Sequence, residues 1–154
     1  MGRGCRIYCG IEQPQSRGQT LAAMRQFPAK TRAIVAVVDD DEAVRRSLKF
    51  MLEIEGFVAR TYANPADFLD AAGLQSFSCV ILDQTLPDMN GLALLRQLRE
   101  RGHSWPAILI ASNPDSAAHE LAAQAGVPIV EKPLFGNSLT EALHTALQGS
   151  PPAP

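Results

Sequence analysis

Residues 78–91 read SCVILDQTLPDMNG, and this stretch decides the fold. Residues 78–82 form a short apolar run, which predicts a strand buried in a parallel sheet. Residues 90–101 then place leucines at helical spacing, which predicts a helix immediately after the strand. Asp83 stands directly after the apolar run. Because functional residues of parallel α/β sheets collect beyond the carboxyl ends of the strands, Asp83 is the first candidate functional residue.

Strand and helix patterns alternate five times along the chain. Further apolar runs predict strands at residues 33–38, 57–61, 106–111 and 127–130. Apolar residues at helical spacing predict further helices at residues 41–55 and 139–147. An N-cap and first-turn pair, Asn64 and Pro65, predicts a short helix at residues 64–72, and an alanine-rich stretch predicts a helix at residues 115–125. Five such units joined by short links predict an α/β domain, a doubly wound five-stranded parallel sheet with helices on both faces.

The two ends of the chain differ from this pattern. Residues 1–32 show no hydrophobic period and are rich in Arg, Gln and Gly, which indicates a flexible N-terminal extension. Met24 is an alternative translation start. We expect residues 33–149 to form one domain and residues 150–154 to be a C-terminal tail, which leaves no room for an output domain.

Composition limits the classes of function. The chain of 154 residues is 46% hydrophobic and 19% charged, with a formal net charge of -2. It therefore shows no basic surplus that would favour nucleic acid. No apolar run approaches the roughly 18 residues of a membrane span, and no secretory signal is visible. Three cysteines, an odd number, argue against a disulfide scaffold, so we expect a cytoplasmic protein.

Acidic residues and one lysine follow three of the predicted strands. Asp39 and Asp40 follow the first strand, Asp83 the third and Lys132 the fifth. Carboxylates held close together repel one another, and a hard cation such as Mg²⁺ relieves that repulsion. Such a site could hold a phosphoryl group for attack by Asp83, with Lys132 neutralising the phosphoryl oxygens.

Each of these residues also has a simpler explanation. Asp39, Asp40 and Asp41 could cap the helix that follows them, where acidic residues are favoured. Lys132 on its own could be an ordinary surface lysine. The coincidence of all the groups at three strand ends is what favours a functional site.

Three segments carry a resemblance to a known family: VVDDDEAVRRSL (37–48), VILDQTLPDMNGLALL (80–95) and VEKP (130–133). In order and spacing they resemble the receiver domains of two-component response regulators, in a stand-alone, single-domain form. The resemblance covers about residues 33–148. It implies a flavodoxin-like (βα)5 fold and transfer of a phosphoryl group to an aspartate from a histidine kinase or a histidine phosphotransfer protein.

The resemblance also implies a role for each site residue. Asp83 is expected to be the phosphoacceptor, and Lys132 the phosphate-binding lysine. The expected Mg²⁺ ligands are Asp83, Asp40 directly, Asp39 through water, and the backbone carbonyl of Thr85. The protein is then a phosphoacceptor that assists its own phosphorylation, and not a conventional enzyme.

Two positions depart from the family pattern. The family usually has Ser or Thr at the end of the fourth strand, where this chain has Ala111, followed by Ser112. Three residues before the lysine, the family often has an aromatic residue, where this chain has Ile129. We therefore expect Asp83 to accept phosphate, with weak or unusual coupling to the surface of the last two strands.

The sequence also suggests a docking surface for a partner and leaves two alternative functions open. Arg45, Arg46 and Lys49 make a basic patch on the first helix, which is either a solvated face or a docking surface for the kinase. The output protein is not identified by the sequence, and a homodimer through the last strands and helices is open. Two alternatives remain: a degenerate receiver that acts as a phosphate-independent scaffold, and a Mg²⁺-dependent aspartyl phosphohydrolase. The second would typically have another acid where Thr85 stands.

Overall fold

The computed structural model describes residues 32–149. The expected N-terminal extension (apart from Arg32), the alternative start at Met24 and the C-terminal tail fall outside these residues. Within the described residues, no helix has the length and apolar character needed to cross a bilayer.

Five parallel strands form one sheet. They are β1 (Ile34–Val38), β2 (Val58–Tyr62), β3 (Cys79–Asp83), β4 (Ala107–Ser112) and β5 (Ile129–Lys132). Their order across the sheet is β2-β1-β3-β4-β5, so the order reverses beside β1. This topology confirms the expected flavodoxin-like doubly wound fold.

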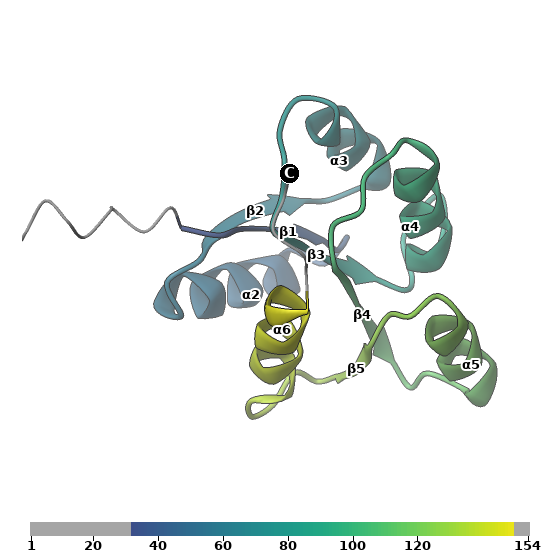
Figure 1. Ribbon diagram of the computed structural model, residues 1–154. Coiled ribbons are helices and arrows are strands. Elements are labelled where there is room, and N and C mark those ends of the chain that lie inside the picture. The colour runs from purple at the N-terminus through teal and green to yellow at the C-terminus, as the bar shows by residue number, and fades with distance from the viewer. Residues whose placement is uncertain (1–31, 150–154) are drawn as a thin grey trace, which may run out of the picture. The chain divides into compact units, whose positions relative to one another are not determined.

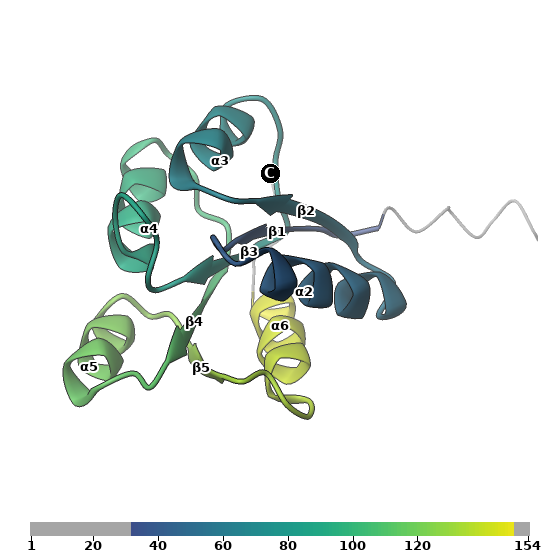
Figure 2. The same cartoon turned by 180° about the vertical axis from the view of Figure 1, so that it is seen from behind.

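Five helices cover the two faces of the sheet. They are α2 (Glu42–Ile54), α3 (Pro65–Ala72), α4 (Gly91–Glu100), α5 (Ser116–Gln124) and α6 (Ser138–Gln148). Helices α2 and α6 lie on one face, and α3, α4 and α5 lie on the other (Figures 1 and 2). Alternate residues of each strand point to opposite faces, so the sheet contributes to two separate hydrophobic cores.

The central strands are apolar on both faces because both faces are covered. All five residues of β3 are buried, including its final Asp83. Val80 and Leu82 pack toward α3 and α4, whereas Cys79 and Ile81 pack toward α2 and α6. The pKa of the Cys79 thiol is raised to about 12 by burial, and the residue packs as a small core side chain.

Four strands end one or two residues later than the apolar runs predict. The expected ends at 61, 82, 111 and 130 become Tyr62, Asp83, Ser112 and Lys132. The reason is that backbone pairing does not need apolar side chains: Ser112 still pairs with Lys132, and Asp83 with Ile110. Hydrophobicity marks the buried part of a strand, and the hydrogen-bonded ladder carries polar residues beyond it.

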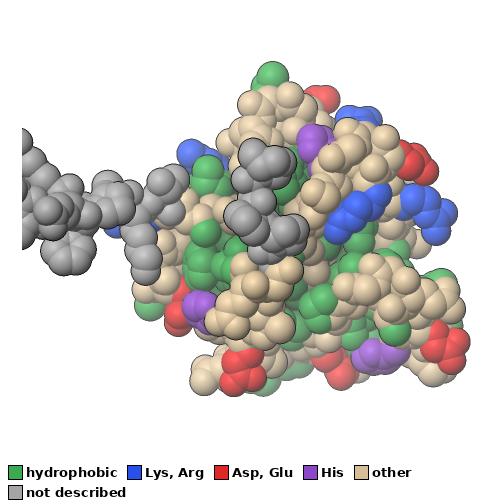
Figure 3. Space-filling view, viewed as in Figure 1, with side chains coloured by type: hydrophobic (Ala, Val, Ile, Leu, Met, Phe, Trp, Pro, Cys, Tyr) green, Lys and Arg blue, Asp and Glu red, His purple; other side chains and the backbone are tan. Residues whose placement is uncertain are grey.

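One face of the described residues carries charges of both signs (Figure 3). Figure 3 shows Lys and Arg side chains interspersed with Asp and Glu on the face that carries α6, with hydrophobic side chains between them.

Candidate functional site

The carboxyl ends of β1 and β3 bring three acidic residues together. One carboxylate oxygen from each of Asp39, Asp40 and Asp83 lies within 4.8 Å of the others. Asp39 and Asp83 are buried, whereas Asp40 is exposed. The prediction that strand ends distant in sequence converge on one acidic cluster is therefore confirmed.

Asp39 is held on all sides. Its backbone N–H donates to the Tyr62 carbonyl at 3.1 Å. Its Oδ1 accepts from the Asp41 backbone N–H at 2.8 Å, and its Oδ2 accepts from Lys132 Nζ at 2.8 Å. Because both carboxylate oxygens are already engaged, Asp39 is less available for direct metal contact than the exposed Asp40.

Lys132 connects the acidic residues of β1 and β3. Its ammonium group lies 2.8 Å from Asp39 Oδ2 and 3.4 Å from Asp83 Oδ1. Burial alone would lower the pKa of Lys132, but the hydrogen bond that it donates to Asp39 and the charges of Asp39 and Asp83 outweigh it, so the pKa is raised. The lysine therefore stays charged beside the acceptor across the physiological range.

Asp83 is a partly neutralised buried carboxylate. Burial, and next the negative charge of Asp39, raise its pKa above the ordinary value. Lys132 and the Thr85 backbone N–H, which donates to Oδ1 at 3.3 Å, act in the opposite direction. Holding the Asp83 carboxylate charged in this buried position costs free energy. A reaction in which the carboxylate attacks and loses its charge relieves that cost, which makes Asp83 a good candidate nucleophile.

Gly91 makes room for the acceptor strand. A Cβ atom at position 91 would lie 2.6 Å from the Asp83 carbonyl oxygen and 3.0 Å from the Leu109 side chain. Glycine is therefore required here by close packing, and not by its backbone angles. The α4 N-terminus can approach the end of β3 only because no side chain intervenes.

The donor set fits a hard divalent cation. Three carboxylates within 4.8 Å of one another offer the oxygen ligands that Mg²⁺ prefers. Asp41 takes no part in this cluster. It caps α2 by accepting from the Ala43 and Val44 backbone N–H groups, so the simple capping explanation is correct for Asp41.

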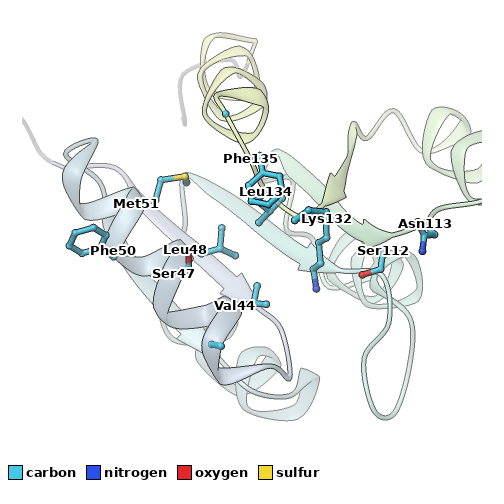
Figure 4. A pocket seen from close by; sticks show the side chains of 13 residues that line it. Val44, Ser47, Leu48, Phe50, Met51, Ser112, Asn113, Lys132, Leu134 and Phe135 are labelled. Carbon is cyan, nitrogen blue, oxygen red and sulfur yellow. The ribbon is translucent and has the colours of Figure 1, made fainter.

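The two atypical positions lie on the same face of the sheet. Ala111 is 3% exposed and pairs with Glu131, while Ile129 packs against the core under α4 and α5. Ser112 points toward the other face, where it lines a groove with Lys132 (Figure 4). The side chain that carries a hydroxyl is therefore on the opposite side of β4 from the alanine.

A buried polar atom beside Ala111 was not anticipated from the sequence. The side-chain Oε1 of Gln84 has no hydrogen-bond partner among the described residues. Gln84 continues β3 by one residue, since its N–H donates to the Ile110 carbonyl, and it is therefore next to Ala111 across the sheet. No sequence pattern could reveal this, because Gln is ordinarily a surface residue.

The basic patch on α2 is engaged within the chain. Arg45 is half-buried and donates through Nη1 to the Asp39 backbone carbonyl at 2.8 Å. Arg46 pairs with Glu42 at 2.8 Å, and Lys49 lies 3.9 Å from Glu53, both at the surface. The sequence placed these three residues on one helix but gave no sign that Arg45 reaches the acidic cluster.

A groove runs beside the site between α2 and the segment after β5. Its volume is about 900 Å³, and Lys132, Ser112 and Asn113 lie at one end (Figure 4). Its walls are mainly apolar side chains: Val44, Leu48, Phe50 and Met51 from α2, and Leu134 and Phe135 from the opposite side. Phe50 is 68% exposed and Phe135 is 79% exposed, so two large apolar side chains of the groove are open to solvent.

This fold and this acidic site with its lysine define a phosphoacceptor module, and the comparison with known families agrees. Residues 35–144 match the response regulator receiver domain, which is more than half of the chain. The chain therefore belongs to the response regulator receiver domain family. The matched residues form a receiver domain, the phosphoacceptor domain of two-component signalling.

Individual relatives are transcriptional and response regulators. The chain is 32% identical over 124 residues to the transcriptional regulatory protein FixJ of Bradyrhizobium diazoefficiens, covering 80% of this chain and 60% of that protein. It is 31% identical over 128 residues to the response regulator protein TmoT of Ectopseudomonas mendocina, covering 82% and 58%. The chain thus spans less than two thirds of the length of these relatives.

Solved structures show the same fold. The crystal structure of FixJ-N superimposes with a TM-score of 0.72 at 31% identity, covering 80% of this chain and 99% of that one. The BeF3-activated DrrB receiver domain superimposes with a TM-score of 0.68 at 26% identity, covering 77% and 99%.

Proposed function

We propose that Asp83 accepts a phosphoryl group from a phosphohistidine of a histidine kinase or a histidine phosphotransfer protein. The observation that carries the proposal is the position of Lys132 Nζ, 2.8 Å from Asp39 and 3.4 Å from Asp83. A cation held beside an acceptor carboxylate is placed to receive the oxygens of an incoming phosphoryl group.

The reaction exchanges one bond for another. An Asp83 carboxylate oxygen attacks phosphorus, a new P–O bond forms, and the P–N bond to the donor histidine breaks with its electron pair returning to the imidazole. Lys132 pairs with the phosphoryl oxygens during transfer, while Asp41 N–H keeps Asp39 in place. Later attack by water on the acyl phosphate releases inorganic phosphate and regenerates the carboxylate.

We propose that Mg²⁺ is held by Asp40, Asp83, Asp39 and the backbone carbonyl of Thr85. Asp40 is exposed and is the direct ligand, while Asp39, whose carboxylate oxygens are both engaged, acts through water. When bound, Mg²⁺ supplies positive charge that reduces repulsion between the carboxylates and the phosphoryl oxygens.

The donor helix is proposed to dock on α2. Arg46 and Lys49 have exposed side chains that a docking helix could contact, whereas Arg45 is directed inward to the Asp39 carbonyl. The adjoining groove leads to Lys132, and its exposed Phe50 and Phe135 offer apolar contact area to such a helix.

We propose that the phosphorylated domain transmits its signal to a partner protein or to residues outside the described part of the chain. The proposal for Ala111, Ser112 and Ile129 is a weak or unusual coupling of phosphorylation to the surface of the last two strands. A homodimer contact could also form through the last two strands and helices. We propose that residues 33–149 constitute the receiver domain, flanked by 1–32 and 150–154. Family membership alone supports a cytoplasmic location.

The test is incubation with Mg²⁺ and acetyl phosphate, followed by intact mass measurement. We expect one added phosphoryl group in the parent and none in Asp83→Asn. Ser112→Ala is a useful companion, because it removes a hydroxyl near Lys132 without touching the acceptor. Labelling of Asp83→Asn to the parent level would refute the assignment of the acceptor.

The same experiment separates the alternatives. A scaffold that does not use phosphate would show no labelling in the parent. An aspartyl phosphohydrolase would release phosphate in multiple turnovers from generic phosphoesters. A receiver turns over slowly and only with acyl phosphate or phosphohistidine donors.

A further inference from the structure

The side chain of Arg45 reaches the acidic cluster from outside it. Its Nη1 donates to the backbone carbonyl of Asp39 at 2.8 Å, although the side chain begins on the first turns of α2. Arg45 is half-buried, whereas the neighbouring Arg46 has an 81% exposed side chain. The two arginines are adjacent in sequence but have different surroundings.

The carbonyl that Arg45 binds belongs to the peptide joining Asp39 to Asp40. A peptide unit is planar, so fixing its oxygen fixes the plane and the direction in which the chain enters Asp40. Asp40 is exposed, and among the described residues its side chain makes no hydrogen bond or ion pair that would hold it in place. The position of Asp40, the exposed candidate metal ligand, therefore depends on the Asp39–Asp40 peptide that Arg45 holds.

The other contacts of Asp39 do not replace this one. The Tyr62 carbonyl fixes its N–H, and Asp41 and Lys132 occupy its carboxylate oxygens. None of these groups contacts the carbonyl. The guanidinium also places a positive charge next to the junction of two acidic residues, which opposes their mutual repulsion.

We propose that Arg45 is a positioning residue for the acidic pair: by holding the peptide between Asp39 and Asp40, it keeps the Asp40 carboxylate directed toward Asp83 for binding a divalent cation. This inference rests on the proposed function, because it assigns Arg45 to the proposed magnesium site. It adds a role for Arg45 that differs from contact with a kinase.

The test compares three variants of the full chain for Mg²⁺ binding, measured by calorimetric titration without any phosphodonor. Arg45→Met removes the guanidinium and keeps an unbranched side chain, and Arg45→Lys keeps the charge and one donor. Arg46→Met is the matched control, since it removes the same group one residue away on the exposed side. We expect Arg45→Met to weaken Mg²⁺ binding about tenfold, Arg45→Lys to recover part of the loss, and Arg46→Met to stay within about twofold of the parent; a tenfold change corresponds to about 1.4 kcal/mol.

Urea titrations with and without Mg²⁺ guard against simple loss of folding. The increase in unfolding midpoint caused by a fixed Mg²⁺ concentration reports cation affinity even in a weakened variant. We expect this increase to be smaller in Arg45→Met than in Arg46→Met. The inference is overturned if Arg45→Met binds Mg²⁺ like the parent, or if Arg46→Met loses as much affinity. If the parent itself does not bind Mg²⁺, the proposed metal site fails, which is a different result.

Discussion

Replacing Lys132 with methionine tests the electrostatic basis of the site. The ammonium group lies 2.8 Å from one oxygen of Asp39 and 3.4 Å from one of Asp83. At an effective dielectric constant near 20, these two attractions are roughly 6 and 5 kcal/mol before other costs. Desolvation of the lysine offsets much of this sum, and breaking a buried pair typically costs about 3–5 kcal/mol.

We expect Lys132→Met to lower the free energy of unfolding by about 3 kcal/mol in the absence of divalent cations. The lower end of the range applies because the lysine side chain is 17% exposed, whereas the Asp39 side chain is 0% exposed and loses its cation. Urea denaturation at pH 7, followed by circular dichroism, measures the change. Saturating Mg²⁺ should restore part of the loss, because it supplies positive charge to the same carboxylates.

The control for this experiment is Lys49→Met. Lys49 lies 3.9 Å from Glu53, and both side chains are more than half exposed, so we expect a change below about 0.5 kcal/mol. The reasoning about Lys132 is wrong if Lys132→Met unfolds within about 0.5 kcal/mol of the parent, or if the two lysine variants are equally destabilised.

The pH dependence has a defined sign. The folded-state pKa of Lys132 is raised above its ordinary value, so its contribution to stability is fully present below the unfolded pKa and is lost as pH rises through the folded pKa. The difference between the parent and Lys132→Met should therefore be constant from neutral pH to about 10 and shrink in more alkaline solution. If the stability difference between the parent and Lys132→Met stayed unchanged in strongly alkaline solution, it would not arise from the charge of Lys132.

Three further predictions concern the surroundings of the acceptor. Gly91→Ala places a Cβ 2.6 Å from the Asp83 carbonyl oxygen, so we expect destabilisation of about 1–3 kcal/mol and slower labelling by acetyl phosphate, whereas Gly73→Ala, with only an ordinary 3.5 Å contact, should change neither. Gln84→Met removes the unpartnered buried Oε1 at nearly constant volume, so we expect a gain of about 1 kcal/mol in urea denaturation; a loss would show that the oxygen is satisfied. Ala111→Thr should enlarge the amide-exchange changes that phosphorylation causes in β4 and β5, and identical responses of variant and parent would disprove weak coupling at this position.

Much of the fold could be predicted because its signals are local. Apolar runs flanked by polar residues defined the five strands, and apolar spacing, helix-capping residues and alanine content defined the helices around them. The strand ends were set too early in four cases, since the ladder continues through polar residues such as Asp83 and Lys132 that no apolar pattern includes. Backbone pairing, and not burial, decides where a strand ends.

The identity of the acidic site was also accessible from the chain alone. Parallel strands place their carboxyl ends at one edge of a sheet, so Asp39, Asp83 and Lys132 had to approach one another once the topology was known. Roles within the cluster were less accessible. Asp41 caps α2 and takes no part in the cluster, which the sequence left open because a capping aspartate and a metal-binding aspartate look alike in a run of acids.

The sequence by itself therefore determined the order of strands and helices, the family, and the set of charged residues at the sheet edge, because these depend on short-range patterns and on the fixed direction of parallel strands. Only the tertiary structure decided which atoms meet. The Arg45 guanidinium on the Asp39 carbonyl, the Gln84 oxygen left without a donor beside Ala111, and the apolar groove next to Lys132 all depend on side-chain directions set by packing between elements distant in the chain. Such contacts leave no periodic signal in a sequence, because each is made once.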